Sequence, residues 1–181
     1  MTNKSISTKK GDCGETGLLN GKRIQKYDLR TETCGTMDEA SSFIGMARAK
    51  CNDEAISSAL LLVQKHLYLM NAELACPDPC KELKEKLSDT ELREIEDIQQ
   101  LVESKLELPK KFVIYGEREL SSIIDTARAV IRRAERRLAE LSAAEQIRPI
   151  LLRYINRASD FLFLLARYDE HSHDAPYRHF K

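Results

Sequence analysis

The chain has 181 residues, enough for one domain with a hydrophobic core and too few for two domains of ordinary size. Lys plus Arg and Asp plus Glu each number 29, so no net charge points to a nucleic-acid or membrane partner. No apolar run approaches the roughly 18 residues of a membrane span and no apolar leader follows Met1, so we expect a soluble, cytoplasmic protein.

The first segment, residues 8–26, is polar, rich in glycine and without helical period. Residues 1–30 carry seven basic side chains against three acidic ones, a local basic patch in a neutral chain. Glycine-rich turns present backbone N–H groups that hold phosphate. The segment is not a Walker A loop, because three residues instead of four separate Gly17 from Gly21 and no Ser or Thr follows Lys22. It indicates an anion site; a flexible basic arm is the alternative.

Five helices are predicted after this segment, because Gly, Pro and aromatic residues are scarce in the chain. Thr36 and Glu39 have the spacing of a capping box that begins the first helix. The other four helices follow from apolar residues at helical spacing and from their flanking caps and prolines. We expect them at residues 56–75, 88–105, 121–141 and 149–168. No segment alternates like a strand, and the short connections predict an all-α, antiparallel five-helix bundle.

The fourth predicted helix separates into two faces at 100° per residue. One face is apolar and would face the core; it consists of Ala127, Val130, Ile131, Ala134, Leu138 and Leu141. The second face holds Arg128, Arg132, Glu135 and Arg136. Residues 128–137 carry five arginines and one glutamate, whose repulsion must be offset by solvent, acids or an anionic ligand. Arginine binds phosphate oxygens with two nitrogens at once, so this face is either solvated or a polyphosphate site.

The fifth predicted helix places Asn156 and Asp160 four residues apart, on a side separate from its apolar residues. An asparagine in the middle of a bundle helix needs a hydrogen-bond partner. Two interpretations stay open at this point. Asn156 either forms a hydrogen bond to a neighbouring helix or contacts a ligand.

Four motifs, in order along the chain, resemble those of the PduO-type ATP:cob(I)alamin (corrinoid) adenosyltransferases. The family's opening T-x-x-G-D-x-G-x-T is matched at residues 8–16, and its G-T-x-D-E leading to S-F-I-G at 35–45. Its A-R-x-x-x-R-R-A-E-R is matched at 127–136, and its Y-[LI]-N-R-x-S-D at 154–160. The resemblance runs from about residue 8 to 168. Four ordered motifs make it far more specific than any one of them.

The resemblance implies a cobalamin adenosyltransferase-like bundle and an enzyme. It would transfer the 5′-deoxyadenosyl group of ATP to the cobalt of cob(I)alamin, giving adenosylcobalamin and triphosphate. The corrinoid is itself the nucleophile, so the protein needs no Ser, Cys or His in that role. Further implications are Mg²⁺ carried by the ATP triphosphate, a homotrimer with sites between subunits, a flavin-type reductase and a B12-dependent acceptor enzyme. Two alternatives are a non-catalytic corrinoid or nucleotide carrier or sensor, and a plain helical scaffold.

The resemblance also assigns site residues, with no protein side chain as a metal ligand. Asp38 and Arg128 would form an intersubunit ion pair at the corrinoid. Phe112 would displace the lower ligand of the corrinoid, and Arg132 joins these three as a catalytic residue. The residues implied to bind ATP, from the N-terminal loop and the helical side, are Thr8, Lys9, Lys10, Gly11, Thr16, Gly17, Lys26, Arg132, Arg133, Glu135, Arg136 and Asn156.

The chain departs from the family pattern after Phe112. Where the family continues F-I-L-P-G-G and later has Leu-His, this chain has Tyr-Gly-Glu at 115–117 and Ile-Asp at 124–125. The loss of Pro and one Gly changes the loop backbone, and Glu117 adds a charge. We therefore expect altered corrinoid affinity or lower-ligand handling with ATP binding intact.

The domain is expected to be single, spanning residues 1–181. Its parts would be an ATP-binding segment at 1–35 and the helical bundle at 36–170. A tail with three histidines at 171–181 has no clear family counterpart. We expect this tail to be flexible rather than a metal site.

Overall fold

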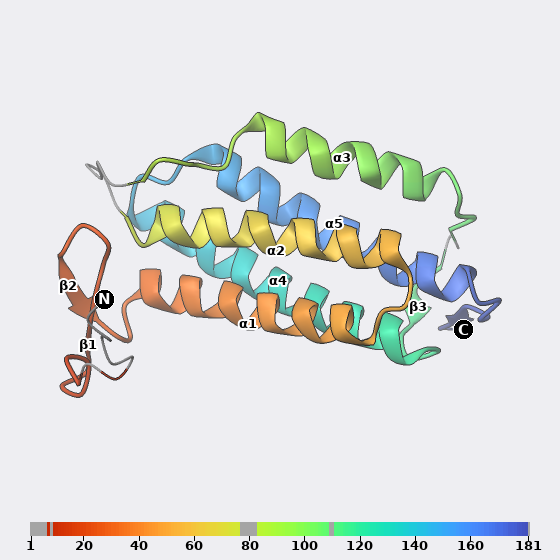
Figure 1. Cartoon of the computed structure of the whole chain (residues 1–181), viewed down its shortest axis with the longest axis horizontal. Helices are drawn as coiled ribbons and strands as arrows, with labels where there is room; N and C mark the ends of the chain where they lie inside the picture. The colour runs from red at the N-terminus through yellow and green to blue at the C-terminus, as the bar shows by residue number, and fades with distance from the viewer. Residues whose placement is uncertain (1–6, 8, 77–82, 109–110, 181) are drawn as a thin grey trace, which may run out of the picture.

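The computed structural model describes residues 7, 9–76, 83–108 and 111–180, which form five long helices and four short strands (Figure 1). The helices are α1 (Leu29–Lys50), α2 (Glu54–Leu74), α3 (Asp89–Glu103), α4 (Glu119–Ala144) and α5 (Pro149–His171). All five predicted helices are present, so the predicted all-α bundle is confirmed. None of the helices in the described part of the chain combines the length and the apolar character needed to cross a membrane.

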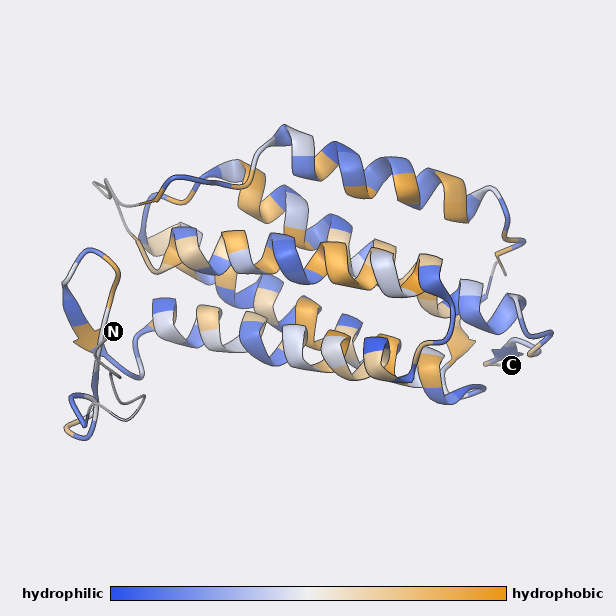
Figure 2. Cartoon of the chain, viewed as in Figure 1, coloured by the Kyte–Doolittle hydropathy of each residue, from blue (hydrophilic) through white to orange (hydrophobic). Residues whose placement is uncertain are grey.

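The helices lie side by side along the long axis of the molecule (Figure 1). α4 packs between α1 and α5, α2 packs against the other flank of α1, and α3 covers α5 and α2. Their apolar faces meet in one core, where Met37, Ile44, Tyr154 and Phe161 are completely buried. Burial of each side chain of this size contributes about 1.5–3 kcal/mol to folding. Figure 2 shows the resulting pattern, with apolar and polar residues alternating around each helix.

The first helix begins before the predicted capping box. Asp28 is its N-cap, and the carboxylate accepts a hydrogen bond of 2.8 Å from the backbone N–H of Arg30. Thr36 is buried inside α1 and donates its hydroxyl proton to the carbonyl oxygen of Glu32, at 2.8 Å. The prediction that Thr36 begins the helix is wrong. The three-residue spacing from Thr36 to Glu39 is the same whether the threonine caps a helix or lies inside one and bonds its hydroxyl to the preceding turn.

A small hairpin precedes α1. Strands β1 (Glu15–Gly17) and β2 (Arg23–Gln25) pair antiparallel, and the turn between them uses Gly21 with φ of 84°, a conformation that favours glycine. The N–H of Leu19 donates to the carbonyl oxygen of Ala75 at 2.9 Å and so attaches the hairpin to the end of α2. Strands of three residues are too short for alternation to be visible in the sequence.

The C-terminal residues fold back onto the loop before α4. Strand β4 (Arg178–His179) pairs antiparallel with β3 (Val113–Ile114). Of residues 171–181, which we expected to form a flexible tail, His171 ends α5 and Arg178 and His179 form β4. The pairing depends on a strand that lies far upstream in the sequence, which is why no local pattern indicated it.

Candidate functional site

The two predicted faces of α4 are confirmed. All six residues of the predicted core face are buried, whereas Arg132, Arg133 and Arg136 are exposed. Arg133 forms an ion pair with Glu39 of α1. In the described part of the chain no ion pair is found for Arg132 or Arg136. These two guanidinium groups are therefore available to an anion such as a phosphate.

Asn156 connects α5 to this face of α4. Its side-chain amide donates a hydrogen bond of 2.9 Å to Oε1 of Glu135. The interhelical hydrogen bond that the sequence left as one possibility is therefore formed. Because Asn156 is also exposed, its amide oxygen remains accessible, and the bond orients the Glu135 carboxylate beside the arginines.

A hollow of about 310 Å³ lies between α3, α4 and α5. Arg128, Arg132 and Asp160 line it, together with the aromatic ring of Phe163. Burial raises the pKa of Asp160 above its ordinary value, although the Arg157 guanidinium acts in the opposite direction. With Glu103 of α3 also in its lining, the hollow combines two cations, two carboxyl groups and an aromatic wall.

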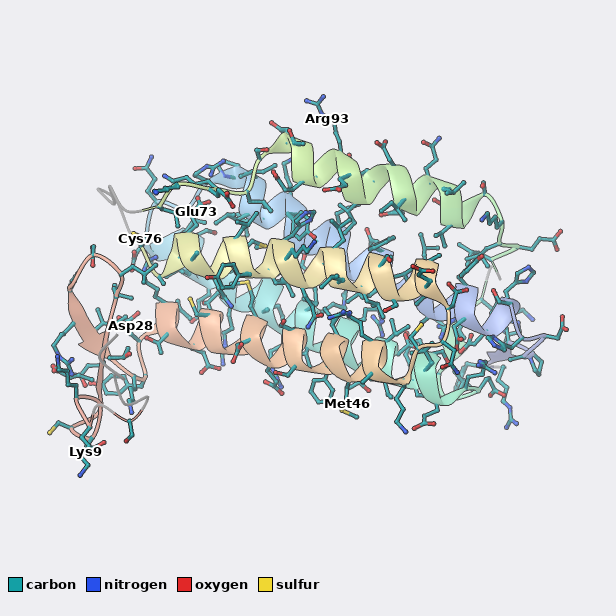
Figure 3. All side chains as sticks on the ribbon, in the orientation of Figure 1. Lys9, Asp28, Met46, Glu73, Cys76 and Arg93 are labelled. Atoms are coloured by element: carbon teal, nitrogen blue, oxygen red, sulfur yellow. The ribbon has the colours of Figure 1, made fainter. Side chains whose placement is uncertain are left out.

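The lysines of the N-terminal segment are exposed, and contacts within the segment hold its backbone in place. Lys26 folds over Gly11, where a Cβ atom would come within 3.2 Å of the lysine Nζ. Arg23 donates from Nη2 to the carbonyl oxygen of Lys10 at 2.8 Å. Lys9 lies at the outer tip of the segment (Figure 3). Of the predicted ATP ligands in this segment, Thr8 lies outside the described residues.

Within one chain the structure brings only part of the predicted site together: Asn156 meets Glu135, and Arg128 and Arg132 line one hollow. The hairpin lies at the end of the bundle where α1 begins, and β3 lies at the opposite end (Figure 1). Asp38 is exposed on α1, and no ion pair joins it to Arg128 among the described residues.

The loop that includes β3 exposes large apolar side chains. Phe112 is 89% exposed and Phe180 of the C-terminal tail is 77% exposed. The N–H of Phe180 donates to the carbonyl oxygen of Phe112, so the two residues belong to one surface. Exposed aromatic residues that cluster mark a surface that contacts a ligand or a partner. Glu117, which the sequence suggested as an added charge, is paired with Arg178 at 2.9 Å.

A buried ion-pair cluster lies beneath this loop, and sequence reasoning missed it. Arg167 is completely buried, and its Nη2 donates to Asp125 at 2.6 Å and to Glu170 at 2.9 Å. Asp125 also accepts from Nε of Arg128 at 3.3 Å. Burial raises the pKa of Asp125, and the Arg167 guanidinium offsets part of this effect. The available signal was Arg167 itself, a charge that follows an almost unbroken apolar run in α5.

These features define a helical bundle with free arginines on one helix and an exposed aromatic loop at one end, a ligand-binding arrangement rather than a plain scaffold. The chain belongs to the cobalamin adenosyltransferase family, whose model matches residues 6–169. The resemblance found in the sequence is thereby confirmed.

Known relatives agree with this membership. A corrinoid adenosyltransferase of Bacillus subtilis is 39% identical over 169 residues, covering 90% of this chain and 84% of the relative. The corrinoid adenosyltransferase PduO of Salmonella typhimurium is 35% identical over 167 residues, which is 92% of this chain. The matched region spans only 50% of that PduO protein.

A solved structure shows the same fold. It is a variant of a PduO-type ATP:corrinoid adenosyltransferase from Lactobacillus reuteri, complexed with cobalamin and ATP. It is 29% identical to this chain, with a TM-score of 0.90, and the match covers 98% of this chain and 99% of the other. The agreement therefore extends over nearly the whole chain.

Proposed function

We propose that this protein transfers the 5′-deoxyadenosyl group of ATP to the cobalt of a reduced corrinoid and releases triphosphate. The observation that carries the proposal is the match, over nearly the whole chain, to a structure that contains both cobalamin and ATP. The relatives named corrinoid adenosyltransferase support the same activity.

The reaction is a displacement at C5′ of the ribose. The electron pair of Co(I) forms the new cobalt–carbon bond. The bond from C5′ to the phosphate oxygen breaks, and triphosphate leaves with the electron pair of that broken bond. The protein must hold C5′ in line with cobalt and stabilise the charge of the leaving triphosphate. Arg132 and Arg136 are suited to the second task, because both are exposed and no ion pair in the described residues occupies them.

We assign the ATP site to the two groups of residues expected from the sequence. Lys9, Lys10 and Lys26 of the N-terminal segment would contact the triphosphate together with its Mg²⁺. Arg132 and Arg136 would contact it from the helical side. The remaining members of the proposed ATP site are Thr8, Gly11, Thr16, Gly17, Arg133, Glu135 and Asn156.

The proposed corrinoid site consists of Asp38, Phe112 and Arg128. Phe112 is exposed and is anchored through its carbonyl oxygen, so its ring is available to the lower face of a corrin and can displace the lower ligand. A four-coordinate cob(II) centre that results from this displacement is easier to reduce. The proposal makes Asp38 and Arg128 an ion pair between subunits.

We further propose a homotrimer of single-domain subunits, with each site between two of them. The separation of the hairpin from the arginine face, and of Asp38 from Arg128, supports this assembly, because a second subunit is needed to bring the two groups together. A flavin-type reductase would supply the electron and a B12-dependent enzyme would accept the product. We place all of these in the cytoplasm, where ATP is available.

The test is an anaerobic absorbance assay with the purified protein, MgATP and chemically reduced cob(I)alamin. The expected result is loss of the cob(I) band and growth of a light-sensitive product that requires both protein and ATP. Binding of ATP and corrinoid without product would replace the enzyme with a carrier or sensor. Absence of saturable ATP binding would contradict both.

A further inference from the structure

We propose that Asp125 is a positioning residue that holds Arg128 ready for the corrinoid site. In this role Asp125 fixes the Nε edge of the Arg128 guanidinium, and the two terminal nitrogens remain for a carboxylate of a neighbouring subunit. The inference rests on the proposed function, because the partner of Arg128 there is Asp38 of a neighbouring subunit.

The first observation is that one buried carboxylate joins two arginines. Asp125 is 5% exposed, and its Oδ1 accepts from Nε of Arg128 at 3.3 Å. Its Oδ2 accepts from Nη2 of Arg167 at 2.6 Å. Arg167 is on α5 and completely buried, so the carboxylate is itself anchored to the core. The carboxylate of Asp125 is therefore fixed in place and does not move with the Arg128 side chain if Arg128 changes rotamer.

The second observation concerns the faces of the guanidinium groups. The ring of Tyr115 lies 4.9 Å from the Arg128 guanidinium carbon and 5.4 Å from that of Arg167. An aromatic ring at this distance attracts a cation and excludes water from that face. Arg128 is thus held at its Nε edge by Asp125 and on one face by Tyr115. Among the described residues nothing accepts from its Nη1 or Nη2.

The third observation is the charge balance of the cluster. Arg128 and Arg167 face Asp125 and Glu170, two cations against two anions. Without the charge of Asp125, Glu170 would be the one buried carboxylate left beside the two guanidinium groups. Arg167 would keep Glu170, its neighbour on α5, and Arg128 would lose its only acceptor in the described chain.

The cluster also joins the two places where the sequence departs from the family pattern. Tyr115 belongs to the first departure and Asp125 to the second, and both contact Arg128 and Arg167. The changes after Phe112 are therefore not independent. Together they form a support for Arg128.

The experiment compares Asp125→Asn with the parent protein and with Asp97→Asn, a matched charge change on the exposed side of α3. Steady-state assays with cob(I)alamin and MgATP give separate KM values for the two substrates. We expect the corrinoid KM to rise by about tenfold or more in Asp125→Asn, with the ATP KM changed less than about twofold. Asp97→Asn should match the parent in both.

A second pair of variants keeps the test decisive if Asp125→Asn folds poorly. Tyr115 is partly exposed, so its substitution disturbs the core little. Tyr115→Ala removes the ring that covers Arg128, whereas Tyr115→Phe keeps the ring. We expect a raised corrinoid KM in the first and a parent-like value in the second. Titration of cob(II)alamin into the ATP-bound protein, followed by absorbance, measures the same loss of affinity without turnover.

The outcomes separate the two proposals. If the parent forms product and neither Asp125→Asn nor Tyr115→Ala changes the corrinoid KM, the role of Asp125 is wrong and the proposed function stands. Equal rises of both KM values would show a general structural defect and would also overturn it. If the parent forms no product, the proposed function fails and the inference fails with it.

Discussion

The backbone N–H of Phe180 donates a hydrogen bond of 3.3 Å to the carbonyl oxygen of Phe112. This contact extends the β3–β4 pairing and ties the C-terminal end of the described chain to the loop with the most exposed phenylalanine. Arg178 adds an ion pair to Glu117 of the same loop. The tail is thus a structural support of the proposed corrinoid site.

Removal of residues 177–181 should loosen this loop without unfolding the bundle. The truncation deletes β4 and leaves β3 unpaired, so the loop opens more often. We expect trypsin to cleave after Lys111 several times faster than in the full chain, with an unchanged helical circular dichroism spectrum. Arg178→Ala is the matched control, because it removes an exposed ion pair worth less than about 1 kcal/mol and keeps the backbone pairing. Equal cleavage of all three proteins would contradict this role of the tail.

Substitution of Arg132 by Ala should abolish turnover in a folded protein. Arg132 is exposed, so its removal leaves the core intact, whereas loss of one charged group at a developing negative charge lowers kcat by about 100-fold or more. The measurement is single-turnover formation of adenosylcobalamin at saturating ATP. Arg93→Ala is the control, since Arg93 projects away from the bundle on α3 (Figure 3). Near-normal activity of Arg132→Ala would refute the site assignment.

Substitution of Arg167 by Leu should strongly destabilise the fold. The variant leaves Glu170 buried without a cation and Asp125 with Arg128 alone, which costs about 3–5 kcal/mol of unfolding free energy. Arg153→Ala breaks the exposed ion pair to Asp89 and should cost less than about 1 kcal/mol. Urea unfolding at one fixed protein concentration compares the two, and similar losses would show that the buried cluster contributes no more than a surface pair.

His66 should make the stability depend on pH. Burial lowers its pKa from 6.5, although Glu94 and Glu91 act in the opposite direction. The unfolded chain therefore binds a proton at a higher pH than the folded chain does. The His66 contribution is complete above about pH 6.5 and is lost as the pH falls from there to the lower folded pKa, by at most about 1.4 kcal/mol per pH unit.

The check is the difference between the parent and His66→Gln in unfolding free energy across pH 5–8. The parent should lose stability relative to the variant as the pH falls below about 6.5. His66 Nδ1 lies 2.9 Å from the hydroxyl of Tyr154, a contact that an amide side chain can partly replace. Parallel pH profiles for the two proteins would mean that His66 has the same pKa in both states.

The elements that the sequence predicted well are those with a long local period. The two faces of α4 followed from 3.6 residues per turn, and the buried and exposed residues match that prediction. The helix boundaries were harder to predict, because the hydroxyl of Thr36 can form a local hydrogen bond to the backbone both inside a helix and at its start. Asp28, the actual cap, precedes a short polar stretch that resembles the loop before it.

The sequence by itself determined that the chain is a helical bundle, which face of α4 carries its arginines, and to which family it belongs. These properties depend on spacing within single segments, where residues a few positions apart must share a face. Only the tertiary structure decided that Asp125 bridges Arg128 to Arg167, that Tyr115 covers them, and that the tail pairs with β3. Apart from the local pair Asp125–Arg128, these contacts join different segments of the chain, and their partners depend on how whole helices and loops pack rather than on any local period.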